Sequence, residues 1–225
     1  MLRAARCSKS LPARFAAGSS FHRCVQTALA AVVVLLASLW IAQIAAAQFN
    51  KDNASAILYQ EDLSNSNGLQ FDGSARWSTE DPSTDQIAVR ADIEIPKAGM
   101  AAQLWLRRNN DATLSASHTI EIALQFSADF PHDGAANVPG LLMRLGATQR
   151  GVPLKGRAEK VTTNVFLLDL SAVEIDMQSN LRLLKERDWI DIPIVYGDGR
   201  RAILAIEKGT PGKEAFAAAF AAWQQ

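Results

Sequence analysis

The clearest group of residues that could perform chemistry lies in the run ADFPHDGAAN. Asp129, His132 and Asp133 are close together there, and carboxylates with an imidazole are groups that bind metal ions. Pro131 and Gly134 mark the same run as a turn, and surface turns collect aspartate and histidine for their own hydrogen bonds. The turn interpretation is favoured, so we expect no metal site.

His118 is the other histidine after residue 47. It is in phase with Ile120 and Ile122, which places it on the apolar face of a strand or at its rim. Such a histidine is more often structural than a general base. Neither a Gly-x-Ser-x-Gly segment nor a phosphate-binding glycine loop is present in the sequence, and both cysteines, Cys7 and Cys24, precede residue 47. We therefore expect no catalytic, cofactor-binding or metal-binding residue after residue 47.

Charged residues narrow the choice of partner. Arg107-Arg108 and Arg200-Arg201 stand at predicted strand ends, where basic residues more often protect sheet edges than bind phosphate. After residue 47 the chain has 18 basic and 23 acidic residues, a net charge of −5. This balance argues against nucleic acid and anionic lipid as partners.

The elements that must position these residues are mainly strands. Alternation of apolar and polar residues predicts half-buried strands, and Gly197-Asp198-Gly199 is typical of a hairpin turn. Pro193 lies inside the first strand of that hairpin, which suggests an edge strand or a bulge. The predicted strands span 56–60, 75–79, 86–95, 100–107, 118–126, 140–145, 161–170, 189–196 and 201–207.

Two helices interrupt the strands. Val173, Met177, Leu181 and Leu184 recur at helical spacing. Many short antiparallel strands with few helices predict a mainly β fold, an antiparallel β-sandwich with two short helices, one of them C-terminal.

The C-terminal helix is predicted to begin with Thr210 as its N-cap and Pro211 at its first position. Phe216, Phe220 and Trp223 then lie on one face. The helix has too few basic residues to favour a membrane surface, so we expect this face to pack on the sandwich.

The first 47 residues read as a targeting segment. Residues 1–23 contain five basic groups and no acidic one, and residues 25–47 have no formal charge and are long enough to span a bilayer. The basic flank should stay in the cytoplasm, which sends the rest of the chain outward. Ala45 and Ala47 before Gln48 match a signal-peptidase site, and cleavage is favoured over a retained anchor.

The expected organisation has three parts. Residues 1–47 form a signal peptide or membrane anchor, 48–55 a linker, and 56–225 a periplasmic β-sandwich-like domain. The membrane is a partner only through the N-terminal segment, if that segment is not cleaved.

Four runs resemble an uncharacterised family of proteobacterial envelope proteins with a signal or membrane segment: RRNNDATLSASHTIEI, ANVPGLLMR, NLRLLKERDWIDIPIVY and RRAILAIEKGTPGKEAFAAAFAAW. The resemblance covers roughly Ile57 to Trp223 and implies a periplasmic setting but no catalytic residue. The ending of the chain is also similar in layout to the invasion-associated locus B family of secreted β-sandwich proteins. That family carries paired cysteines, which are missing here after residue 47.

Two functions follow as hypotheses. The first is a non-catalytic envelope module that binds a protein, a peptide or an envelope polymer. The alternative is a hydrolase that acts on an envelope component through carboxylates not identifiable in the sequence. A smooth surface with an exposed apolar patch would favour the module, and a buried carboxylate pair in a cleft would favour the hydrolase.

Overall fold

Alternating burial defines the central strands. The computed structural model describes residues 53–80, 87–146 and 148–224. In β3 (Ala88–Ile95), β4 (Met100–Arg108) and β5 (Ala116–Phe126), buried residues alternate with partly exposed ones over most of each strand, because successive side chains point to opposite faces. The other strands are β1 (Asn53–Asp62), β2 (Asn65–Glu80), β6 (Ala135–Asn137), β7 (Leu142–Arg144), β8 (Val152–Pro153), β9 (Gly156–Thr162), β10 (Val165–Ser171), β11 (Trp189–Tyr196) and β12 (Arg201–Glu207).

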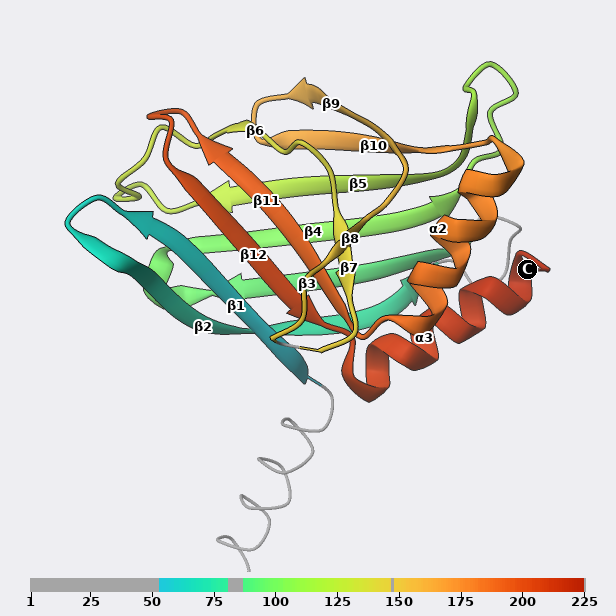
Figure 1. Ribbon diagram of the computed structural model, residues 1–225, viewed down its shortest axis with the longest axis horizontal. Helices are drawn as coiled ribbons and strands as arrows, with labels where there is room; N and C mark the ends of the chain where they lie inside the picture. The colour runs from blue at the N-terminus through green and yellow to red at the C-terminus, as the bar shows by residue number, and fades with distance from the viewer. Residues whose placement is uncertain (1–52, 81–86, 147, 225) are drawn as a thin grey trace, which may run out of the picture. The chain divides into compact units, whose positions relative to one another are not determined.

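These strands form one curled antiparallel sheet. Its order is β8-β7-β11-β12-β1-β2-β3-β4-β5-β10-β9, with β6 pairing beside β7 on β11. Figure 1 shows β1, β11 and β12 crossing in front of β3, β4 and β5. One core cluster joins the two layers, for example Leu58 and Leu204 in one and Leu104 and Ile122 in the other. The mainly β, sandwich-like fold predicted from the sequence is confirmed.

The two ends of the sheet meet at a seam. β8 and β9 stand at opposite ends of the strand order, yet Leu154 and Lys155 alone connect them. The backbone of Lys155 is held by Asn180, whose side chain accepts a hydrogen bond from the Lys155 N–H at 2.8 Å and donates one to its carbonyl at 2.7 Å. Just after it, a Cβ on Gly156 would lie 2.3 Å from the Asp169 carbonyl oxygen, so the chain passes where only glycine fits.

Helix α2 (Glu174–Glu186) supplies Asn180, which is 1% exposed. Of the four apolar positions that predicted this helix, Leu184 is buried, Met177 and Leu181 are half-buried, and Val173 is exposed. The buried face therefore lies partly elsewhere and includes a polar side chain. A buried amide is stable only with its hydrogen bonds made, and here the seam makes them.

Helix α3 (Gly209–Ala222) packs on β1, β2 and β3. Phe216, Phe220 and Trp223 are all buried, as the sequence predicts. Trp223 donates from Nε1 to the Ile87 carbonyl at 3.1 Å, and its ring lies 5.1 Å from that of His118. His118 is 1% exposed, which confirms its predicted place on the apolar face.

Lys208 joins the two helices. Its ammonium is buried, donates to the Leu184 carbonyl near the C-terminal end of α2, and lies 4.1 Å from the centre of the Phe216 ring in α3. A cation near a helix C-terminus and over an aromatic face is favourably placed. Burial lowers the pKa of Lys208 to about 8, although Asp188 acts in the opposite direction.

Several boundaries differ from the predicted ones. The predicted strand 161–170 is two strands, β9 and β10, because Asn164 adopts a positive φ of 61° in the turn between them. β1 begins at Asn53, so residues 53–55 belong to the first strand and not to the linker. Helix α3 begins at Gly209, and Pro211 is therefore its third residue instead of its first.

Pro193 does not lie in an edge strand, because β11 is paired on both sides. On its outer side β7 pairs with residues 189–191 and β6 with residues 195–196, which leaves residue 193 between them. A proline has no N–H to donate, so this interval in the ladder tolerates it.

Replacing Asn180 with alanine should destabilise the protein by about 1–3 kcal/mol, because the Lys155 N–H would lose its partner, while the Lys155 carbonyl keeps the hydrogen bond from the Ser171 N–H. Urea unfolding measures the change. Gln178→Ala on the exposed side of the same helix is the control and should change stability by less than about 0.5 kcal/mol. Equal effects of the two substitutions would show that the seam does not depend on Asn180.

Phe220→Ala should cost about 3–5 kcal/mol, because a large buried aromatic ring is lost from the α3 interface. Thermal melting of the full-length protein measures it, with the exposed Glu214→Ala as a matched variant on the same helix. A melting temperature that Phe220→Ala leaves unchanged would mean that the helix is not part of the core.

Candidate functional site

The loop that contains Asp129, His132 and Asp133 follows β5 at the end of the sandwich opposite the two helices (Figure 1), whereas His118 and Arg108 contact Trp223 at the helix end. There the turn η1 (Pro96–Ala98) follows β3, the loop 127–134 follows β5, and the β11–β12 turn lies beside them. The Ser127 N–H donates to the Gly99 carbonyl at 2.8 Å, and the Gly197 N–H donates to the Gly134 carbonyl at 2.9 Å. These bonds hold the three turns together.

His132 is oriented by residues far away in the sequence. Its Nδ1 donates to Asp198 Oδ2 at 2.7 Å, since a carboxylate only accepts. Its ring stacks on Tyr196 with 4.5 Å between centroids and 7° between planes, and only 5% of its side chain is exposed. The Tyr196 hydroxyl accepts from the buried Gln60 at 2.8 Å. His132 is thus a packed, hydrogen-bonded side chain.

Asp129 and Asp133 do not join His132. The carboxylate of Asp129 accepts from the Ser127 side chain, which lowers its pKa, and the Cβ of Asp133 lies against Gly197. No group of three metal-binding side chains occurs among the residues that the structure describes. The partner that matters for His132 is Asp198, which the sequence marks only as a hairpin residue.

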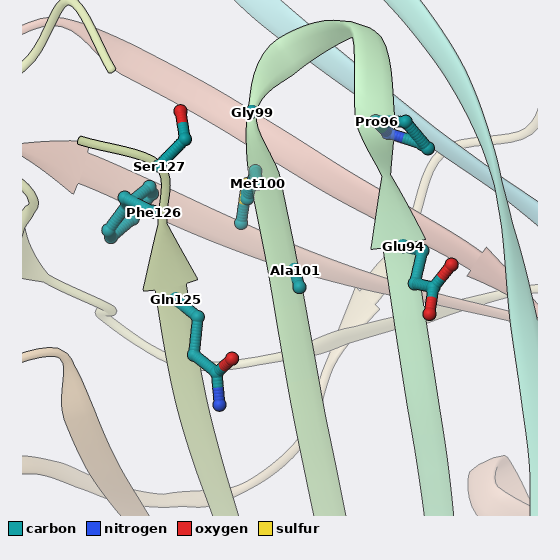
Figure 2. A pocket seen from close by; sticks show the side chains of 8 residues that line it. All are labelled: Glu94, Pro96, Gly99, Met100, Ala101, Gln125, Phe126 and Ser127. Atoms are coloured by element: carbon teal, nitrogen blue, oxygen red, sulfur yellow. The ribbon is translucent and has the colours of Figure 1, made fainter. Parts of the chain in front are cut away.

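Two hollows flank the contact between Gly99 and Ser127. The first has a volume of about 360 Å³, and the second, about 280 Å³, lies along η1 and the start of the 127–134 loop. Figure 2 shows the first, with Ala101 on β4 between Glu94 on β3 and Gln125 on β5. The first hollow is lined by Glu94, Pro96, Gly99, Met100, Ala101, Gln125, Phe126 and Ser127. Pro96, Gly99 and Ser127 also line the second hollow, together with Lys97, Ala98, Asp129, Phe130 and Pro131.

The wall between the hollows requires a glycine. Gly99 has a φ of +62°, and a Cβ there would lie 2.3 Å from Ser127 Oγ. Phe126, which lines the first hollow, packs against Phe130, which lines the second, with ring centroids 4.3 Å apart. Proline and aromatic surfaces therefore line both hollows, with polar groups at their rims.

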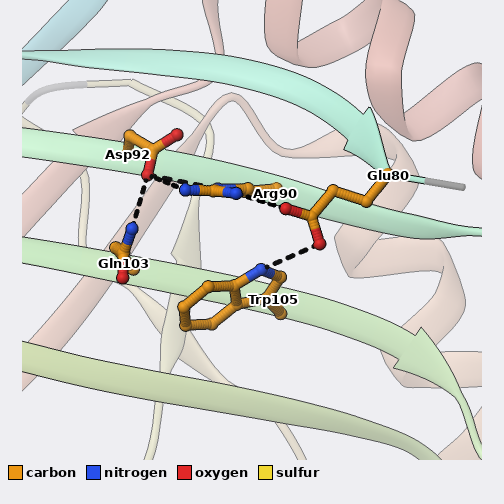
Figure 3. Close-up of polar contacts among 5 residues, drawn as sticks. All are labelled: Glu80, Arg90, Asp92, Gln103 and Trp105. Carbon is orange, nitrogen blue, oxygen red and sulfur yellow. Dashed lines mark hydrogen bonds and ion pairs between the residues drawn. The ribbon is translucent and has the colours of Figure 1, made fainter.

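A polar network covers the same outward sheet face one row further along (Figure 3). Arg90 pairs with Glu80 and, at 2.7 Å, with Asp92, which also accepts from Gln103 at 2.9 Å. Burial acts to raise the pKa of Asp92, but the hydrogen bonds from Arg90 and Gln103 outweigh it and the pKa is lowered. Trp105 donates to Glu80 at 3.2 Å, so these groups are mutually satisfied and stiffen the face beside the first hollow.

The arginine pairs do not guard sheet edges, because β4 and β12 both lie inside the sheet. Arg107 faces Glu121 at 3.6 Å and Arg108 donates to the Trp223 carbonyl at 3.0 Å. Arg200 lies 3.6 Å from Asp198. The side chains of Arg107, Arg108 and Arg200 thus contact groups of the protein itself.

No family model, curated protein or solved structure matches the chain. Within residues 53–80, 87–146 and 148–224, no helix combines the length and the hydropathy that a membrane span needs. The predicted targeting segment lies outside the described residues.

The hydrogen bond from His132 lowers the pKa of Asp198 below its usual value of 3.8, with a further contribution from the Arg200 N–H. The ionised Asp198 carboxylate therefore stabilises the folded protein at pH values above 3.8, the usual pKa of an aspartate. This stabilisation is lost as the pH falls through the lowered pKa of Asp198 in the folded protein. In His132→Ala the pKa of Asp198 should rise toward 3.8, as measured by carboxyl ¹³C NMR.

Asp62 is the internal control for that titration, because its lowered pKa comes from Ser64. It should titrate alike in both proteins. An Asp198 pKa that the substitution leaves in place would show that the His132 contact does not set it.

Proposed function

We propose that the protein is a non-catalytic, exported module of the bacterial envelope that binds an extended segment of a partner protein. The observation that carries the proposal is the pair of proline- and phenylalanine-lined hollows on either side of Gly99. Hollows of this volume lined by apolar rings with a few polar groups are typical of binding sites.

The lining suggests how such a segment would bind. Aromatic and proline surfaces favour the rigid rings of an extended, proline-containing chain, which loses little conformational entropy on binding. Pro96 and Phe126 would contact one side chain of the segment, and Phe130 and Pro131 the next. Glu94 and Gln125 line the first hollow where they would bond the backbone of the ligand.

The setting of the module rests on the N-terminal segment. Five basic residues followed by 23 uncharged ones favour export, with the domain in the periplasm. If the segment is not cleaved, it would anchor the module in the inner membrane. For the hydrolase alternative, no aspartate or glutamate is buried among the described residues.

Binding is tested with an array of synthetic decapeptides, with and without proline, probed with the full-length protein. Ala101→Leu should weaken capture of the best proline-containing peptides at least tenfold, because the added atoms fill the first hollow. Ala123→Leu is the matched control, since it faces outward on the neighbouring strand and lines neither hollow. Failure to capture any peptide, or equal capture by Ala101→Leu and the natural protein, would contradict the proposal.

A further inference from the structure

A third hollow lies at the seam, away from the turns that form the candidate site. Its volume is about 480 Å³, and four segments meet around it: the loop before β5, the start of β9, the end of β10 and the first turn of α2. Both signs of charge line it. The polar members are Ser115, Lys155, Arg157, Asp169, Ser171 and Asp176.

Asp169 is the unusual member. On the outward face of β10 it stands in register with Thr119 on one side and Arg157 on the other. Its Oδ1 is closed off from solvent and has no hydrogen-bond partner among the described residues. Burial and the nearby Glu159 raise the pKa of Asp169, while Arg157 opposes the shift. A shielded carboxylate oxygen with no donor is costly, and Asp169 as a whole is half-buried and lines the hollow, so a donor bound there at its carboxylate would offset the cost.

The walls of the hollow are held in place. Asn109 donates from its side chain to the carbonyls of Leu114 and Ala116 at 2.9 and 2.8 Å, which orders the loop before β5. Asn180 holds the Lys155 backbone, and Ser171 donates to Asp176 at 3.0 Å. The cavity is thus formed before any ligand arrives.

The charges select the ligand. Lys155 has no ion-pair partner in the described part of the chain, and Arg157 faces Glu159 at 2.5 Å with most of its side chain exposed. These cations would repel a simple cation, and the carboxylates of Asp169 and Asp176 would repel a simple anion. A molecule that carries both charges satisfies both sets.

We propose that this hollow binds a free amino acid, with the ammonium group donating to Asp169 and the carboxylate held by Lys155 and Arg157. This hollow shares no lining residue with the two hollows beside Gly99, so the proposal does not depend on whether those hollows bind a peptide. Occupation would add hydrogen bonds at the place where the two ends of the sheet meet.

The test uses the full-length protein and four probes: L-alanine, glycine betaine, propionate and ethylamine. Betaine lacks N–H donors, propionate lacks the amine, and ethylamine lacks the carboxylate. L-Alanine should shift the amide signals of Ser115 and Gly156 in a saturable way in NMR titration and raise the melting temperature with concentration. The other three should bind at least tenfold more weakly.

Asp169→Asn should weaken L-alanine binding at least tenfold, and its own melting temperature shows whether the variant is folded. Glu159→Gln, which removes a neighbouring carboxylate that does not line the hollow, should bind L-alanine within threefold of the natural protein. Betaine binding as well as L-alanine, undiminished binding by Asp169→Asn, or no saturable shift with any probe would each overturn the proposal.

Discussion

The fold depends on joining the two ends of its own sheet. An antiparallel sheet such as the one that the twelve strands of the described residues form would normally leave two open edges, each a row of unpaired backbone groups. Here the edge strands β8 and β9 are separated by two residues of chain, so the sheet must curl until its ends are adjacent. Asn180 completes the junction by bonding the N–H and the carbonyl of Lys155, and the Ser171 N–H at the end of β10 also donates to that carbonyl. The curl is what encloses the single core.

The curled sheet has two ends that differ in what covers them. At one end α2 and α3 cover the core, and the buried Lys208 ties them together through Leu184 and Phe216. At the other end the described residues form turns, which bond to one another through Gly99, Ser127 and Gly134. The two hollows beside Gly99 lie at this turn end.

Much of this could be predicted from local patterns. The alternation through Ile87–Ile95, the turn at Gly197–Gly199 and the aromatic spacing from Phe216 to Trp223 each depend on residues a few positions apart, and the structure confirms them. Asn180 could not be predicted as a buried residue, because its partner lies 25 positions away and only the folded seam brings them together.

The pairing of His132 with Asp198 was missed for the same reason, since 66 positions separate them. The residues nearest in sequence, Asp129 and Asp133, suggested a site, but the turn directs them elsewhere. The hollows beside Gly99 also left no signal beyond a turn-forming glycine, because each is built from segments far apart in the sequence; Phe130 and Pro131, for example, reach the second hollow from a different loop.

The strand order has a consequence for how the chain is made. β1, the first strand, pairs with β12, among the last elements to be synthesised, through contacts such as Ala56 with Ile206. Because the chain is synthesised from its N-terminus, one side of β1 stays without its partner strand until almost all of the domain has left the ribosome. Contacts this distant in sequence slow folding. The backbone of β1, the first strand to be synthesised, is thus exposed for longest in the nascent chain, and we expect a chaperone to bind there.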